Sequence, residues 1–368
     1  MFTGHGSVRW ERAEGVRRIV VHTSHRGSTF LALRSHRRRR RDLEGLPPAD
    51  PDQVYVKVAA LNGGFLTLPE RNFVTDPDPQ KGTTVPSMCF LIEHPSGRTK
   101  TKSTTESTNT TRVVFDLGIK RDLTKYVQPA TQHHITTRQP VYSSADARSS
   151  LLGGGLDPAK GDVDYVILSH IHWDHIGLPS DYPRSKFIVG SGTLYILENG
   201  APHYPLERIE KGALPVDRTI ELPAVPGSDR KHMAATVQTD HEWESISTLP
   251  NAVDFFGDGS LWIIDAPGHI HGHVNALLRV GPDKWVYLGG DCCHDRRIIT
   301  GEKQILEYDN GQGKLKSAHA ELSKAKKTIE NVQELIRVNG EEAVEWIVAH
   351  DWKWASENQN RFFPGWMY

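Results

Sequence analysis

The chain is organised around one stretch, Asp164-Tyr-Val-Ile-Leu-Ser-His-Ile-His-Trp-Asp-His-Ile-Gly177. Its apolar and β-branched start, residues 165–168, is typical of a short buried strand. Directly after this strand, within six residues, come four potential metal ligands: His170, His172, Asp174 and His175. Core packing gives no reason for three imidazoles and a carboxylate at this density, so the pattern predicts a metal site.

The composition favours neither a nucleic-acid-binding protein nor a membrane protein. The 368 residues carry a formal net charge of −1, which favours neither a nucleic acid nor a membrane surface as a partner. Apolar runs stay shorter than the ~20 residues of a membrane span, so we expect no membrane segment. The three cysteines include the adjacent pair Cys292 and Cys293, which we interpret as small buried hydrophobes. Reduced thiols and the absence of a signal-peptide pattern predict a cytoplasmic protein.

The first 53 residues differ from the rest of the chain. Between Met1 and Arg41, eleven arginines stand against two glutamates, and the segment ends in the run Arg37–Arg41. Clustered like charge predicts a disordered basic extension. A mitochondrial presequence and a nuclear or polyanion-binding patch are the alternatives. We therefore divide the chain into an extension, residues 1–53, and a domain that carries the metal site, residues 54–368.

From residue 54 onward, short apolar runs alternate with turns, which predicts two sets of strands with helices between them. The strands are expected at 54–61 continued by 65–68, and at 86–93, 113–118, 165–168, 186–190, 253–256, 260–265, 274–280, 285–289 and 345–349. Helices are expected at 121–127, 144–152, 192–198 and 317–338, the last with an amphipathic core stripe. Residues 96–112 are polar and predict a long hairpin loop, and the Pro- and Gly-rich residues 199–235 predict an excursion near the mouth of the site, interpreted as a substrate-binding cap.

Further potential ligands follow the ends of other predicted strands. His269 follows strand 260–265, Asp291 follows strand 285–289, and His350 follows strand 345–349. A strand end is rigid on one side and free on the other, so side chains placed there can converge on one point. We therefore expect these residues to meet the 170–175 group in a single site.

Four motifs in this order carry a resemblance to a known family. They are H-x-H-x-D-H at 170–175, P-G-H-x-x-G-H at 267–273, G-D at 290–291 and A-H-D at 349–351. Over roughly residues 54–358 the chain resembles the metallo-β-lactamase superfamily, and most of all its acyl-homoserine-lactone-type lactonases and fungal lactamase-like hydrolases. The resemblance implies an α/β (α+β) fold, a four-layer αββα sandwich with the metal site at one edge.

The resemblance also implies a ligand set for two metal ions. The first metal would be held by His170, His172 and His269; the second by Asp174, His175 and His350; Asp291 would bridge both. Imidazoles with a carboxylate bridge suit two Zn²⁺ per chain, and Fe or Mn can occupy similar sites. Two metals ~3.5–4 Å apart can share a hydroxide and polarise a carbonyl oxygen, so the reaction class is hydrolysis.

Other residues near the motifs receive roles of their own. Asp174 is expected to move the proton as well as to bind metal. His294 stands where the lactonase branch has a tyrosine that contacts the substrate, and either a catalytic or a supporting role remains open for it. Asp116 is expected to accept hydrogen bonds from the site loops, and His273 to be structural. Trp173 lines either the pocket floor or the core.

The predicted function is opening of a lactone or lactam ring in a small, partly apolar molecule. A thioesterase of the glyoxalase-II or polyketide-releasing type is the alternative with the same site, although no basic pocket for glutathione is visible in the sequence. A non-catalytic or nucleic-acid-binding member is the alternative of another class. Intact ligands argue against the former, and the extra domain of the nucleic-acid branch is not found between Gly192 and Gly257. The oligomeric state stays open.

Overall fold

The computed structural model describes residues 45–95, 110–210, 212–228, 239, 241–309, 311, 313 and 315–368. The chain divides into two units, Met1–Asp42 and Leu43–Tyr368, and all described residues belong to the second. The arginine run of the predicted extension therefore lies outside the described residues. In the part of the chain that the structure describes, no helix combines the length and the apolar character that a membrane crossing requires.

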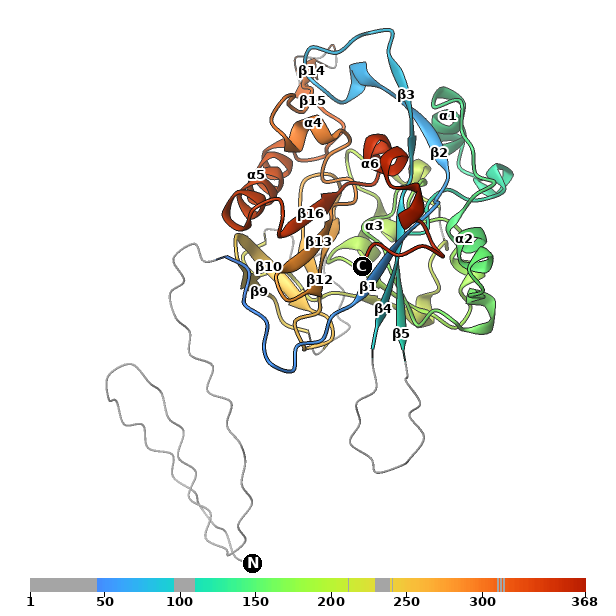
Figure 1. Cartoon of the computed structure of the whole chain (residues 1–368). Helices are drawn as coiled ribbons and strands as arrows, with labels where there is room; N and C mark the ends of the chain where they lie inside the picture. The colour runs from blue at the N-terminus through green and yellow to red at the C-terminus, as the bar shows by residue number, and fades with distance from the viewer. Residues whose placement is uncertain are drawn as a thin grey trace, which may run out of the picture. The chain divides into compact units, whose positions relative to one another are not determined.

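Two six-stranded sheets form the centre of the second unit (Figure 1). In spatial order the first consists of β1 (Lys57–Leu61), β4 (Cys89–His94), β5 (Thr111–Phe115), β6 (Tyr165–Ile167), β7 (Lys186–Val189) and β8 (Thr219–Glu221). The second consists of β16 (Val344–Ile347), β13 (Lys284–Leu288), β12 (Val274–Gly281), β11 (Leu261–Asp265), β10 (Leu249–Asp254) and β9 (Glu244–Ile246). Strands β5 to β8 run parallel, and so do β13 and β16.

Helices flank the two sheets, and two small hairpins complete the described part. The helices are α1 (Pro129–Thr137), α2 (Ala147–Gly153), α3 (Thr193–Asn199), α4 (Arg296–Ile299), α5 (Leu322–Asn339) and α6 (Trp352–Glu357). The hairpins pair β2 (Phe65–Pro69) with β3 (Gly82–Pro86), and β14 (Tyr308–Asp309) with β15 (Leu315–Lys316).

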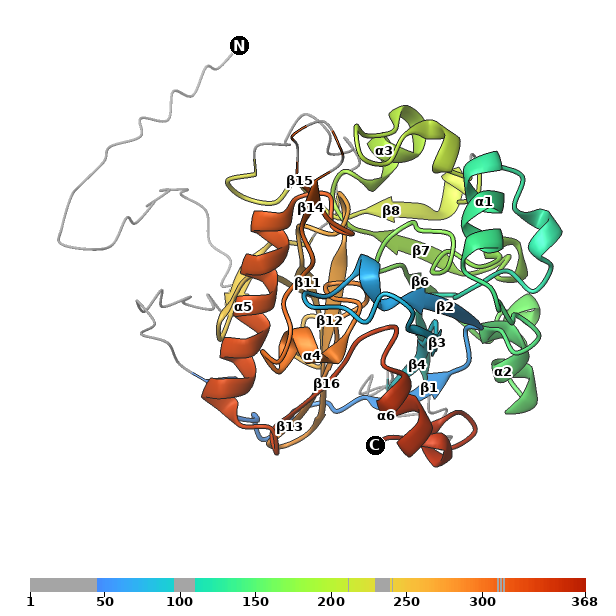
Figure 2. The ribbon, with the colours of Figure 1, turned by 90° about the horizontal axis from the view of Figure 1, so that it is seen from above.

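Three clusters of buried apolar side chains define the layers. One lies between the sheets and joins Val58 of β1 to Ile263 of β11. The other two pack α2 and α3 on the first sheet and α5 on the second. Figure 2 shows these helices on opposite outer sides of the sheets. The predicted four-layer αββα sandwich is confirmed.

Helix α5 shows how the sequence sets this packing. Its buried residues Ala325, Ile329, Val332 and Leu335 recur at helical spacing and face the second sheet. The helix begins five residues after the predicted start at residue 317. The residues before it instead bond to the loop after β11, with Ala320 N–H donating to His269 O and Glu321 N–H to Gly268 O, both at 2.9 Å. These bonds pull the segment toward the predicted site.

Several local predictions differ from the structure. The helix predicted over 121–127 is wrong, because only a 3₁₀ turn, Leu123–Lys125, forms there. Helix α1 was missed, since only Thr131 and Ile135 of its nine residues are buried and no apolar stripe marks it. Strand β2 does not continue β1 but pairs with β3 in a separate hairpin. The predicted hairpin around 96–112 is confirmed by the antiparallel pairing of β4 and β5, whereas residues 96–109 themselves lie outside the described residues.

The segment 45–53, assigned from sequence to the extension, packs on the domain. The buried Arg279 of β12 donates through Nη1 to Gln53 Oε1 (2.7 Å) and to Pro48 O (3.2 Å). Leu46 N–H donates to Asn339 Oδ1 at 2.7 Å, at the end of α5. This segment therefore lies in the same unit as the sheets.

Candidate metal centre

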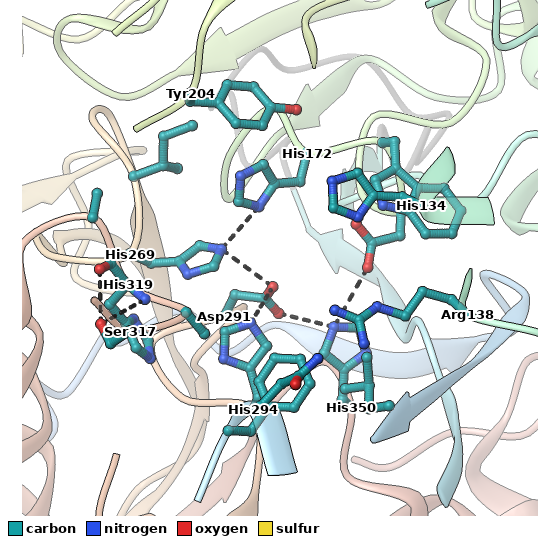
Figure 3. A pocket seen from close by; sticks show the side chains of 18 of the residues that line it. His134, Arg138, His172, Tyr204, His269, Asp291, His294, Ser317, His319 and His350 are labelled. Atoms are coloured by element: carbon teal, nitrogen blue, oxygen red, sulfur yellow. Dashed lines mark hydrogen bonds and ion pairs between the residues drawn. The ribbon is translucent and has the colours of Figure 1, made fainter. Parts of the chain in front are cut away.

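The predicted ligands meet because their strands end at one edge of the sandwich. His170 follows β6 in the first sheet, while His269, Asp291 and His350 follow β11, β13 and β16 in the second. Each of β11, β13 and β16 points the same way, because β12 runs antiparallel to both of its neighbours and β16 runs parallel to β13. The strand ends of both sheets thus bring all seven predicted ligands together. Figure 3 shows His172, His269, Asp291 and His350 among them.

A first group of donor atoms surrounds one point. His172 Nδ1 lies 2.9 Å from both His170 Nε2 and His269 Nε2. Asp291 Oδ2 lies 3.4 Å from His269 Nε2 and 3.7 Å from His170 Nε2. Donors that bind one Zn²⁺ tetrahedrally at ~2.0–2.2 Å lie roughly 3.3–3.5 Å apart, and the separations of this group, 2.9 to 3.7 Å, lie on both sides of that range.

A second group lies on the other side of Asp291. Its Oδ1 is 3.2 Å from His350 Nε2 and 3.3 Å from His175 Nε2. Asp174 Oδ2 completes the group, 3.6 Å from His350 Nε2 and 3.9 Å from His175 Nε2. Among the described residues of the two groups, Asp291 places one oxygen in each, which is the position that a bridging ligand requires.

Asp116, at the end of β5, supports both groups from behind. Its carboxylate accepts Ser169 N–H and Oγ–H, each at 2.6 Å, and lies 2.9 Å from His175 Nδ1. Ser169 Oγ in turn lies 2.9 Å from His170 Nδ1. Asp116 adopts a left-handed backbone (φ 62°), which a non-glycine residue seldom does. The predicted acceptor role of Asp116 is confirmed.

Two further hydrogen bonds orient the second-sheet ligands. His350 Nδ1 lies 2.8 Å from Pro86 O, to which it donates, so Nε2 faces the centre. His273 Nε2 accepts the backbone N–H of Asp291 at 3.1 Å, which requires a neutral ring. Burial accordingly lowers the pKa of His273 to about 3. The predicted structural role of His273 thereby takes a definite form: it fixes the backbone of Asp291, the predicted bridge.

Electrostatics and burial fit the donor set to a cation. Burial lowers the pKa of His170, His172 and His269 well below the usual value, so these imidazoles offer neutral lone pairs. Burial alone would raise the pKa of Asp291, but His175 and its other histidine neighbours hold it well below the usual range. Asp291 Oδ1 and His175 Nε2 are both buried and have no hydrogen-bond partner among the described residues. Nitrogen and carboxylate donors of this kind suit Zn²⁺. Ligation itself stays a prediction.

A cavity of about 540 Å³ opens above the two groups. Asp174 and His294 both line it, and His294 Nε2 lies 3.3 Å from Asp291 Oδ2. Trp173 combines both of its predicted roles, because it lines the cavity while its ring packs edge-on against buried Tyr126, 5.7 Å between centroids. Tyr204 lies over His172 with 4.6 Å between ring centroids, so the 199–235 excursion does reach the site.

His319 was not among the residues predicted from the sequence. It is 5% exposed, lines the cavity, and lies 5.2 Å by ring centroid from both His269 and His294. With these two it forms a third group of potential ligands whose donor atoms lie within 4.8 Å of one another. Its neighbours in sequence carry no ligand spacing, and only the backbone bonds that fold residues 317–321 onto the β11 loop bring it here.

A basic pocket, which is not visible in the sequence, is present in the structure. Arg71, Arg138 and Arg208 all line the cavity. They come from separate segments, the β2–β3 hairpin, the end of α1 and the 3₁₀ turn Leu206–Arg208. Because no two of them are close in sequence, no local charge pattern could reveal the cluster.

Comparison with known proteins shows the family. The chain is 30% identical over 187 residues to the gamma-lactamase MBL2 of Gibberella moniliformis, which covers 50% of this chain and 70% of that protein. It is 28% identical over 336 residues to the cytochrome P450 monooxygenase mpaDE of Penicillium roqueforti, covering 84% of this chain and 35% of that protein. The chain thus spans about a third of the length of that relative. No family model matches the sequence.

Solved structures agree on the fold. An N-acyl homoserine lactone hydrolase, solved with N-hexanoyl-L-homoserine bound at its catalytic metal centre, superimposes with a TM-score of 0.55. The match covers 86% of this chain and all of that one at 17% identity, and therefore shows the fold alone. Together with the gamma-lactamase relative, these findings establish that the chain belongs to the metallo-β-lactamase superfamily, a family of metal-dependent hydrolases.

Proposed function

We propose that this chain is a metal-dependent hydrolase with two metal ions, and that it opens the ring of a small lactone or lactam. The observation that carries the proposal is the position of Asp291, whose Oδ1 lies 3.2 Å from His350 Nε2 while its Oδ2 lies 3.4 Å from His269 Nε2. One carboxylate shared by two donor groups is the arrangement of a dinuclear site. Zn²⁺ bound there supplies Lewis acidity and a water whose pKa is ~7.

The chain's own residues provide the proton handling. Asp174 lines the cavity and, at 3.6 Å from His350 Nε2, contacts only one donor group. One of its oxygens can therefore hold the proton that the attacking water loses and pass it to the leaving oxygen or nitrogen. His294, across the cavity floor beside Asp291, is placed to donate a hydrogen bond to the substrate carbonyl or leaving atom.

The size and walls of the cavity support a small substrate. A volume of about 540 Å³ lies within the ~300–1,000 Å³ range of small-molecule sites. Leu66, Leu68 and Phe73 line one part and Tyr204 another, so an apolar ring can be covered on more than one side. The gamma-lactamase name of the relative from Gibberella supports a cyclic amide, and a lactone presents the same ring carbonyl with an easier leaving group.

A thioesterase is the second candidate, and the basic residues of the cavity support it. The three arginines that line the cavity could hold the acidic groups of a thiol carrier. A linear thioester and a lactone differ in whether the two products stay joined. Because the metal chemistry is common to both reactions, only a comparison of substrates distinguishes a thioesterase from a ring-opening hydrolase.

The test compares metal-stripped and Zn²⁺-reconstituted protein on matched lactones, lactams and thioesters, with ring opening followed by mass spectrometry. We expect activity only after reconstitution, with lactones or lactams preferred, and loss of at least about 10³-fold in His172→Ala. Full ring opening by the stripped protein or by His172→Ala would contradict the metal-dependent mechanism. A preference for linear thioesters would replace the ring substrate with the second candidate.

A further inference from the structure

The mouth of the cavity carries positive charge without a matching negative charge. Arg71, Arg138 and Arg208 line it, whereas the carboxylates among the described lining residues are Asp174 and Asp291, both predicted metal ligands. Arg71 Nη1 donates to the backbone oxygen of Pro79 at 3.0 Å. In the described part of the chain, no hydrogen bond or ion pair engages the guanidinium of Arg138 or of Arg208. The guanidinium groups of Arg138 and Arg208 can therefore donate hydrogen bonds to a ligand that enters the cavity.

The backbone of Arg138 is fixed. Its N–H donates to His134 O at 2.9 Å, ending α1, and its carbonyl accepts Thr67 N–H from β2 at 2.9 Å. The guanidinium carbon lies 5.4 Å from the centre of the Phe73 ring, and that ring lies 4.7 Å from the ring of His294. The Phe73 ring thus contacts both the guanidinium of Arg138 and the ring of His294 at the cavity floor.

The backbone of Arg208 is fixed beside the first donor group. Tyr204 Oη donates to Arg208 O at 3.0 Å, and the Tyr204 ring lies 4.6 Å from the ring of His172. The guanidinium of Arg138 thus lies one aromatic ring, Phe73, from His294. The backbone of Arg208 lies one aromatic ring, Tyr204, from His172, and its side chain also lines the cavity. Burial lowers the pKa of Arg138, which shows that water already solvates this cation incompletely.

We infer that the substrate carries a carboxylate on its apolar framework, held by Arg138 with Arg208 as the second cation, while its ring carbonyl lies at the floor. The inference rests on the proposed ring-opening function and names the substrate class within it. A planar guanidinium matches a carboxylate with two parallel hydrogen bonds, which lysine cannot reproduce. Partial burial strengthens such bonds, and Phe73 and Tyr204 cover the framework between the two ends.

A separate anchor for the carboxylate sets the orientation of the substrate in the cavity. A free carboxylate can also bind metal, so a substrate anion without its own anchor would occupy the floor and exclude the ring. Arg138, one ring's width away, offers the anion a competing site that leaves the ring carbonyl free. Specificity then comes from Arg138 rejecting a neutral analogue, because the partly buried guanidinium would stay unpaired.

Turnover is tested with two lactones that differ in one group: N-succinoyl homoserine lactone, which ends in a carboxylate, and its terminal carboxamide. We expect kcat/KM to favour the carboxylate, and the ratio to fall by about 10- to 100-fold in Arg138→Gln. Arg138→Lys should lose most of the same ratio because it keeps the charge but lacks the planar fork. The matched control is Arg337→Gln, an exposed arginine on α5 that pairs with Glu334 and should keep the parent ratio.

Binding is tested without turnover by titration calorimetry on the Zn²⁺-loaded protein. The probes are N-cyclopentyl succinamic acid and its primary amide, which lack a lactone or lactam ring. We expect the acid to bind more tightly than the amide and to lose about 10- to 100-fold in Arg138→Gln. Equal affinity of the acid for parent and Arg138→Gln would overturn the inference, because the metal would then be the anchor. In the turnover experiment, an equal carboxylate-to-carboxamide ratio of kcat/KM in the parent and in Arg138→Lys would also overturn the inference, since positive charge alone would suffice.

The two measurements separate this inference from the proposed function. If neither lactone is opened but the acid probe depends on Arg138, the proposed ring opening fails and the carboxylate anchor stands. If both lactones are opened equally well by the parent and the acid probe gains nothing over its amide, ring opening stands and the anchor is overturned.

Discussion

At the floor of the cavity, the side chains of the predicted metal ligands are held by hydrogen bonds to the protein itself, whereas the guanidinium groups of Arg138 and Arg208 at the mouth have no such partner among the described residues. His175 is fixed by Asp116, and His350 by the carbonyl of Pro86. Arg138 and Arg208 have fixed backbones but, among the described residues, no partner for their guanidinium groups. The floor is therefore built to keep one geometry, and the mouth to receive a partner. Substitutions at the two regions should fail differently.

The largest effect is expected from Asp291→Ala, which removes the carboxylate that we propose is shared by two metal ions. Both donor groups lose an oxygen, so we expect the metal content to fall and kcat/KM to drop by at least about 10³-fold. Metal analysis and a lactonase assay on the same preparation check this. Wild-type metal content together with wild-type activity would show that Asp291 is not a ligand.

The next largest is expected from His294→Phe, which keeps a ring beside Phe73 but removes the nitrogen near Asp291. A hydrogen bond or proton given to the reacting atoms is worth about 10²–10⁴-fold, so kcat should fall by about 10²-fold with KM little changed. His319→Phe is the matched control at the neighbouring ring. Equal losses in both variants would mean that the rings act by packing and not by proton donation.

Asp116→Asn tests the support behind the floor. An amide can no longer accept from Ser169 and His175 together, so ring orientation is lost while every ligand remains. Such outer residues are worth about 10- to 100-fold in metal affinity or activity. The exposed turn residue Asp283 provides a control as Asp283→Asn. Unchanged Zn²⁺ affinity in Asp116→Asn, measured by chelator competition, would contradict the role given to this carboxylate.

The smallest effect concerns the pH dependence of stability. The pKa of His273 is about 3 in the folded protein against ~6.5 unfolded, so the unfolded state binds more protons between these values. The stability that a neutral His273 contributes is complete above pH ~6.5 and is lost as the pH falls toward 3. Between pH 7.5 and 5.5 the parent should lose about 1 kcal/mol more than His273→Asn, as measured by urea unfolding. An equal loss of unfolding free energy in the parent and in His273→Asn would contradict this contribution of His273.

The floor could be predicted from the sequence because its chemistry is concentrated. His170 to His175 stand together, and His269, Asp291 and His350 each follow a strand whose apolar run is readable. The strand ends then had to converge, since a sandwich brings them to one edge. The helices were less readable where packing is light: α5 has a full apolar stripe, whereas α1 buries only two of its nine residues.

The mouth could not be predicted in this way. Arg138 belongs to the missed helix α1, and Arg208 to the long excursion after α3. His319 reaches the cavity only because Ala320 and Glu321 bond to the β11 loop. Each position depends on a contact distant in sequence, so local patterns carry no trace of it. The class of reaction can therefore be predicted from the sequence of this chain, whereas the residues that select the substrate are identified only in the folded structure.

The central claim is that Asp291 lies between two metal ions. Crystals of the Zn²⁺-reconstituted protein, measured at the zinc absorption edge, test it most directly. The account predicts two anomalous peaks about 3.5–4 Å apart, one on each side of Asp291, with His172 beside the first and Asp174 beside the second. A single peak, or a peak centred among His269, His294 and His319, would contradict it.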